Sequence, residues 1–135
     1  MRSVLLTATL FMALANAHAA EPIGALASLT TDGGSFEVKL GSTPRPIPLN
    51  ELFELNVEVR ALGEAKDPNP LWLDVTATMP AHKHGMNTLP RVEDLGDGRF
   101  VVRGLLFHMA GEWELEFDVV KGRIHEHAVT RVSLK

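Results

Sequence analysis

The stretch GEWELEFDVV, residues 111–120, alternates apolar and acidic side chains at almost every step. In an extended chain, successive side chains point to opposite faces, so Trp113, Leu115, Phe117 and Val119 share one face. An alternation of period two over this length is typical of a strand with one buried face. We therefore predict a strand over residues 112–120 whose aromatic face lies in the core.

The same pattern recurs along the chain. Phe53 to Arg60, FELNVEVR, repeats the alternation, and Gly-, Pro- and Asp-rich turn signals separate such segments. Residues 49–52 are the one segment that could begin a helical turn. Short strands at this spacing favour an all-β fold, an immunoglobulin-like antiparallel β-sandwich of about seven strands. The other predicted strands cover residues 35–40, 71–79, 99–107 and 124–134, with residues 21–27 as a loose leader or edge strand.

The amino-terminal residues have the pattern of a secretory signal peptide. Arg2 supplies a positive start, an apolar run covers residues 4–14, and small residues follow. Cleavage is predicted after Ala19, which gives a signal peptide over 1–19 and a single domain over 20–135. The apolar run is short for a membrane span, although a retained anchor is the alternative. We therefore expect a periplasmic protein.

Composition excludes several classes of function. The formal net charge is −4, and without Arg2 12 basic side chains face 17 acidic ones, so a nucleic-acid partner is not expected. Cysteine is absent, which excludes disulfides and thiolate metal sites. Any metal must be held by His, Met or carboxylate. Nucleophile-elbow, phosphate-loop and dinucleotide motifs are also absent, so we do not expect an enzyme.

Soft metal ligands gather in one window of the chain. The segment MPAHKHGMN, residues 79–87, holds two histidines and two methionines, and His108-Met109 follows before Gly111. If this segment is extended, the spacing of two residues places His82, His84 and Met86 on one face. The end of the strand over 99–107 could come beside it in a sandwich. The candidate metal ligands are Met79, His82, His84, Met86, His108 and Met109.

Thioether and imidazole groups together favour Cu(I), with Cu(II) where histidines dominate, whereas zinc seldom uses methionine. The window therefore predicts a copper site. Other interpretations stay open. Met79 lies on the inward face of its strand and would then be core filler, and Met109 could pack on Trp113. Residues 82–84 could be an exposed polar loop, and Lys83 is an unfavourable neighbour for a cation.

A second histidine pair occurs on the last predicted strand. His125 and His127 alternate with apolar positions, so both imidazoles are expected to face solvent. Two solvated surface residues are the favoured interpretation, and a weak second metal site is the alternative. The carboxylates are likewise expected on the outer strand faces.

The segment MPAHKHGMNTLPRVEDLGDGRFVVRGLLFHMAGEWELEFDVV, residues 79–120, resembles the YtkA-like family of small exported domains, which is related to FixH-like proteins. The shared pattern is Met-Pro, a His/Gly/Met segment, a turn into a strand, and Met-x-Gly-x-Trp. The resemblance implies an immunoglobulin-like sandwich outside the cytoplasm. For some relatives it implies copper handling or the assembly of copper-containing membrane enzymes. On this pattern Gly85 supplies backbone freedom, and Gly111 and Trp113 are structural.

These observations predict a periplasmic copper-binding carrier or chaperone, with a copper-containing membrane enzyme or transporter as its partner. The alternative is a metal-free β-sandwich that serves as an accessory interaction module of a cell-envelope complex, with the loop over 79–87 as its recognition surface. A third interpretation requires cleavage after Ala17, which would leave His18 at the amino terminus as a copper ligand.

Overall fold

The computed structural model describes residues 27–63 and 68–135. The predicted signal peptide, its cleavage site and His18 lie outside these residues. Within the described ranges, no helix is long and apolar enough to cross a membrane.

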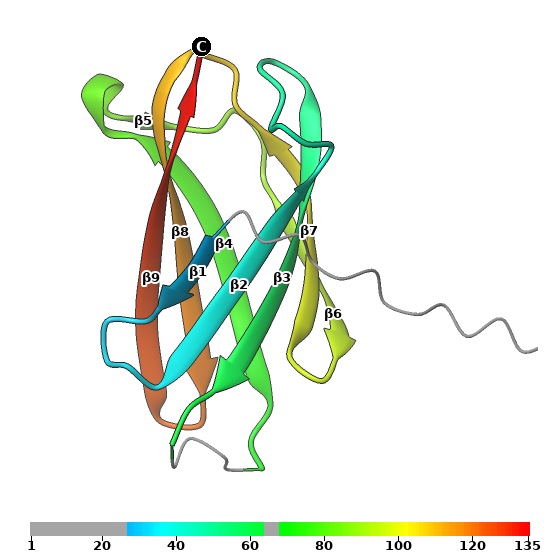
Figure 1. The fold of residues 1–135 in the computed structure, drawn as a ribbon, viewed down its shortest axis with the longest axis vertical. Coiled ribbons are helices and arrows are strands. Elements are labelled where there is room, and N and C mark those ends of the chain that lie inside the picture. Colours follow the sequence, from blue (N-terminus) through cyan, green and yellow to red (C-terminus); the bar gives the residue numbers. More distant parts are fainter. Residues whose placement is uncertain (1–26, 64–67) are drawn as a thin grey trace, which may run out of the picture.

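Two antiparallel sheets pack face to face (Figure 1). One sheet has the order β1-β2-β3-β7-β6 and the other β5-β4-β8-β9. The predicted all-β sandwich is confirmed, and three short strands, β1, β5 and β6, join the six that were predicted individually. The elements of the described chain are β1 Ala27–Thr30, β2 Phe36–Thr43, β3 Leu52–Ala61, β4 Leu71–Met79, a 3₁₀ turn η1 Pro80–His82, β5 His84–Gly85, β6 Arg91–Gly96, β7 Arg99–Leu106, β8 Gly111–Lys121 and β9 Ile124–Leu134.

The core lies between the sheets, where the alternating apolar faces meet. Trp113 of β8 is fully buried, and its indole stacks on Phe107 with ring centroids 4.7 Å apart and an interplanar angle of 12°. Phe53 of β3 meets Phe107 edge to face at 4.9 Å. Such aromatic contacts add to the hydrophobic gain from burial. The aromatic face predicted for β8 therefore anchors the core at one end of the sandwich.

Residues 49–52 do not form the helical turn that the sequence left open. Leu52 already begins β3, and the residues before it form a bend. Asn50 has a positive φ of 58°, which is incompatible with a right-handed helix, and its N–H donates to the carbonyl oxygen of Phe107 at 2.8 Å. This bond ties the β2–β3 connection to the end of β7.

Strand β8 connects the two ends of the molecule. It begins at Gly111, near β5, and ends at a two-residue turn, Gly122 and Arg123, that leads into β9. Gly122 has φ 58°, the left-handed conformation that tight hairpin turns require. The β5 loop and the β8–β9 turn lie at opposite ends of the sandwich (Figure 1).

Candidate metal centre

Three predicted histidines come together at the β5 end of the sandwich. The His84 ring centroid lies 5.2 Å from that of His108 and 5.8 Å from that of His82. The Trp113 indole meets the rings of His84 and His108 edge to face, at 5.8 Å and 5.4 Å. Segments that are 24 residues apart in the sequence are thus adjacent, as the strand arrangement predicted. We call His82, His84, Met86, His108 and Met109 the His/Met end.

The backbone from residue 80 to residue 83 is not extended, so the premise that placed residues 82, 84 and 86 on one face is wrong. Pro80 opens the 3₁₀ turn η1, as proline favours at a helix start. Lys83 then takes the left-handed conformation at φ 55°, and its N–H donates to the Pro80 carbonyl. The chain reverses there, and β5 pairs antiparallel with the end of β4.

The Nδ1 atoms of His84 and His108 differ in their hydrogen bonding. His84 Nδ1 lies 3.0 Å from the carbonyl oxygen of Gly85. Because a carbonyl oxygen only accepts, that nitrogen carries the proton, and Nε2 of the neutral ring keeps its lone pair. His108 Nδ1 is buried and has no hydrogen-bond partner among the described residues, a property it shares only with the hydroxyls of Ser42 and Thr88 there.

The three methionines within residues 27–63 and 68–135 occupy different environments. Met79 is 1% exposed in the core, where a Cβ added at Gly111 would lie 2.4 Å from its Cε, so it matches the core-filler interpretation. Met86 is partly buried against the core. Met109 is 36% exposed, and its backbone carbonyl accepts a 2.9 Å bond from Trp113 Nε1. Two thioethers, of Met86 and Met109, are therefore outside the fully buried core.

A shallow cavity of about 380 Å³ opens beside η1. His84 and Lys83 line it together with Met79. The His/Met end thus combines one imidazole at a solvent-accessible hollow with another whose nitrogen is buried. Its three histidines do not form a convergent triad of ligand atoms in the described chain. A metal there would need methionine sulfur or side-chain rotation to complete its coordination.

A convergent triad occurs elsewhere, on the outer face of the four-stranded sheet. Asp118, His125 and His127 each offer a ligand atom, and these atoms lie within 4.8 Å of one another, the only such group in the residues described. The exposure predicted for the two histidines is confirmed. Sequence reasoning missed Asp118, although the outward period of β8 included it. Its pairing with His127 follows from the register of the hairpin.

The expectation that carboxylates lie only on outer faces is wrong at Glu126. This side chain points inward and is 9% exposed. Its carboxylate accepts bonds from the hydroxyls of Thr31 and Ser35, both at 2.5 Å, and from the Ser35 N–H at 3.0 Å. Burial raises the pKa of Glu126, but the bonds from Ser35 and Thr31 outweigh it, and the pKa falls below its ordinary value.

The space for this carboxylate comes from a glycine. A Cβ added at Gly33 would lie 2.2 Å from Glu126 Oε1, so a larger residue could not occupy that turn without displacing the carboxylate. The turn between β1 and β2 therefore packs directly on β9, and polar bonds join the two sheets at this side.

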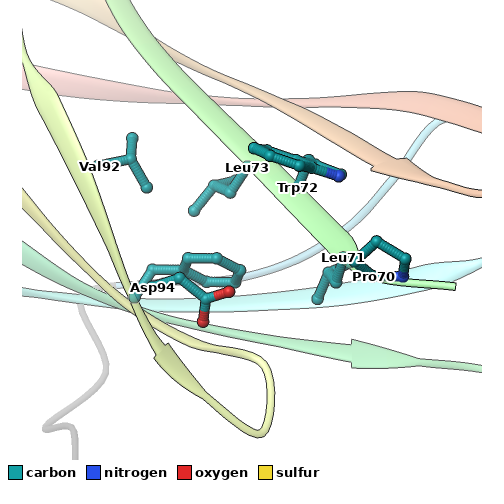
Figure 2. A pocket seen from close by; sticks show the side chains of 7 residues that line it. Pro70, Leu71, Trp72, Leu73, Val92 and Asp94 are labelled. Atoms are coloured by element: carbon teal, nitrogen blue, oxygen red, sulfur yellow. The ribbon is translucent and has the colours of Figure 1, made fainter.

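The opposite side of the sandwich carries an apolar cleft of about 250 Å³ between β4 and β6. Figure 2 shows Trp72 and Leu73 of β4 on one side, with Val92 and Asp94 of β6 on the other. Trp72 is 68% exposed. Neither histidine cluster contributes to this cleft.

The described residues form an antiparallel β-sandwich that carries two separate clusters of histidines. No family model, curated protein or solved structure matches the chain. The resemblance to the YtkA-like family stays a prediction that rests on residues 79–120.

Proposed function

We propose that the protein is a periplasmic copper carrier that holds Cu(I) at the His/Met end. The observation that supports this most directly is the buried Nδ1 of His108, which has no hydrogen-bond partner in the described chain and belongs to a ring 5.2 Å from that of His84. Burial of an unpaired polar atom costs about 1–3 kcal/mol. A metal bond to that nitrogen would remove this cost.

The state of His84 supports the same proposal. Its Nδ1 is held by a backbone carbonyl, which fixes the tautomer and leaves Nε2 for a metal. Met86 and Met109 are the nearest sulfur donors in the sequence, and a thioether selects Cu(I) over harder ions. Release of the ion requires no oxidation or reduction of the imidazole and thioether groups. Transfer to a copper-containing membrane enzyme or transporter would then proceed by ligand exchange.

The test is a competition titration of tag-free protein against a chromophoric Cu(I) chelator. The His84→Ala/Met86→Ala double variant should bind Cu(I) at least about tenfold more weakly than wild type, the loss typical even of an outer-shell partner. His125→Ala/His127→Ala is the matched control, with two exposed histidines removed, and it should compete like wild type. Equal competition by wild type and the His84/Met86 variant would exclude the His/Met end as the site.

A second candidate is the metal-free interaction module. The observation in its favour is the cleft between β4 and β6 together with the edge of β4. Strand β4 pairs with β5 only at Thr78 and Met79, so within the described chain residues 71–77 have no strand partner on that edge. Unpaired edges bind extended segments of partner proteins. Trp72→Ala should then weaken binding to an envelope partner without changing Cu(I) affinity.

A further inference from the structure

The three side chains of the triad on the outer sheet face converge on one carboxylate oxygen. His127 Nδ1 lies 2.5 Å from Asp118 Oδ1, and His125 Nε2 lies 3.2 Å from the same oxygen. The two imidazole centroids are 4.9 Å apart. One carboxylate oxygen is therefore shared by two rings, and all three side chains point to a common region.

The triad lies on a regular antiparallel hairpin formed by β8 and β9. Asp118 and His127 are direct cross-strand partners in β8 and β9, and His125 lies two residues before His127 on the same face. The two-residue turn at 122–123 fixes this register. Sites built on strands hold their ligands more precisely than sites built on loops.

The backbone at His127 is also held from the other sheet. Asp32 Oδ1 accepts the His127 N–H at 2.9 Å, and the Asp32 N–H donates to the His127 carbonyl at 2.8 Å. These bonds cover the free edge of β9 at one ligand position. They hold the backbone of this ligand residue in place from the other sheet.

Two carboxylates lie directly opposite each other at the triad. Asp74 of β4 is the direct cross-strand partner of Asp118, and it is exposed. Like charges directly opposite in a sheet are destabilising. A bound cation at Asp118 would offset this repulsion.

From these contacts we infer that Asp118, His125 and His127 bind a borderline divalent cation, Cu(II) more tightly than Zn(II). Two imidazole nitrogens and a carboxylate oxygen suit both ions, and Cu(II) stands above Zn(II) in the general affinity order. The triad contains no sulfur, so it differs in kind from the His/Met end.

The distances fit with small side-chain movements. Ligand atoms bound at about 2.1 Å to one ion lie about 3.0–3.4 Å apart at angles near 90–110°. The present separations range from 2.5 Å to at most 4.8 Å, so Asp118 must open slightly and one imidazole must close. The side chains of His125 and His127 are 57% and 54% exposed, which leaves room for both adjustments and for water at the remaining positions.

The test uses tag-free purified protein, since a polyhistidine tag would bind the same ions. Cu(II) is titrated and followed by electron paramagnetic resonance, and Zn(II) is titrated in parallel by calorimetry. His125→Ala/His127→Ala should lose about tenfold or more in Cu(II) affinity and lose the nitrogen couplings. Asp118→Asn, which keeps the side-chain shape, should weaken Cu(II) binding while both nitrogen couplings persist. Glu112→Gln, which alters an exposed carboxylate on the same face of β8, is the control and should keep the wild-type spectrum.

The outcomes separate this site from the proposed function. Cu(II) affinity unchanged in both the His125/His127 variant and Asp118→Asn would overturn the inference, as would an equal loss of Cu(II) affinity in the Glu112→Gln control. Zn(II) bound more tightly than Cu(II) would overturn the stated preference. Thermal melts of each variant check the fold, and Asp118→Asn decides the question if the double variant unfolds. None of these results depends on Cu(I) binding at the other end.

Discussion

The two histidine clusters lie near opposite ends of β8, and they are built in different ways. Trp113 and Asp118 are five residues apart, about 17 Å along a strand. The His/Met end consists of loops packed on a buried indole, with sulfur nearby and one imidazole nitrogen buried. The Asp/His triad lies on a regular hairpin ladder, open to solvent, with oxygen in place of sulfur.

In this molecule, the more buried of the two clusters is also the one with the softer ligands. The loop-built cluster depends on the core for its shape, and its ligands suit a soft ion. The ladder-built cluster depends on hydrogen-bond register, and its ligands suit a borderline ion. Damage to the core should therefore affect the first cluster more than the second.

The largest effect is expected for Trp113→Ala. Removal of a fully buried indole that stacks on Phe107 should lower the free energy of unfolding by about 3–5 kcal/mol. The His/Met end should lose its geometry, because Trp113 contacts the rings of both His84 and His108. Chemical denaturation measures the loss. Trp72→Ala is the matched control, since a 68% exposed tryptophan should cost within about 0.5 kcal/mol.

If Trp113→Ala removed Cu(II) binding at the triad as completely as Cu(I) binding at the His/Met end, in protein that is still folded, the two clusters would not be independent. The comparison would then fail.

An intermediate effect is expected for Glu126→Gln, which acts beneath the triad. The amide lacks the negative charge that three donors from Thr31 and Ser35 now share, so the free energy of unfolding at pH 7 should fall by about 1–3 kcal/mol. The measurement is urea denaturation of metal-free protein. Glu58→Gln, on the other sheet, is the control and should change little. An unchanged stability for Glu126→Gln would mean that these bonds add nothing to the junction of the sheets.

The smallest effect is expected at Glu37, on the five-stranded sheet and away from both clusters. The Arg60 guanidinium, with the Ser28 hydroxyl, lowers the pKa of Glu37 below its ordinary value of 4.5. A lowered folded-state pKa means that the stabilisation is present above about pH 4.5 and is lost as the pH falls through the lower folded-state value. The stability difference between wild type and Glu37→Gln should therefore shrink with acidification.

Thermal melts of both proteins between pH 7 and pH 3 measure this difference. A difference that grows at low pH would contradict the assigned direction. The comparison of wild type with Glu37→Gln also gives a pH dependence of stability that arises away from both clusters. The pH effects on either cluster can be compared with it.

The fold was predictable where side chains alternate strictly. Trp113 to Val119 and Phe53 to Val59 show period two, and both segments are strands with buried apolar faces. The short strands β5 and β6 were missed because β5 has two residues and β6 faces mostly solvent, so neither carries an alternating pattern.

The candidate site was predictable only in part. The clustering of His82, His84 and His108 was foreseeable from a strand end near a loop. The reversal at Lys83 was not, because a positive φ at lysine has no sequence signal. Asp118 was missed because its pairing with His127 depends on which residues form the hairpin turn. The inward position of Glu126 depends on a glycine more than 90 residues earlier in the chain.

The stacking of Trp113 has an optical consequence. Among the residues described, its indole is enclosed by Phe107 and two imidazoles, whereas Trp72 is open to solvent. The two fluorophores should emit at separate wavelengths, Trp113 towards the blue and Trp72 towards the red. A copper ion at the adjacent imidazoles would quench the blue component first. The protein thus carries an intrinsic reporter that distinguishes occupancy of its loop-built end from events on its open flank.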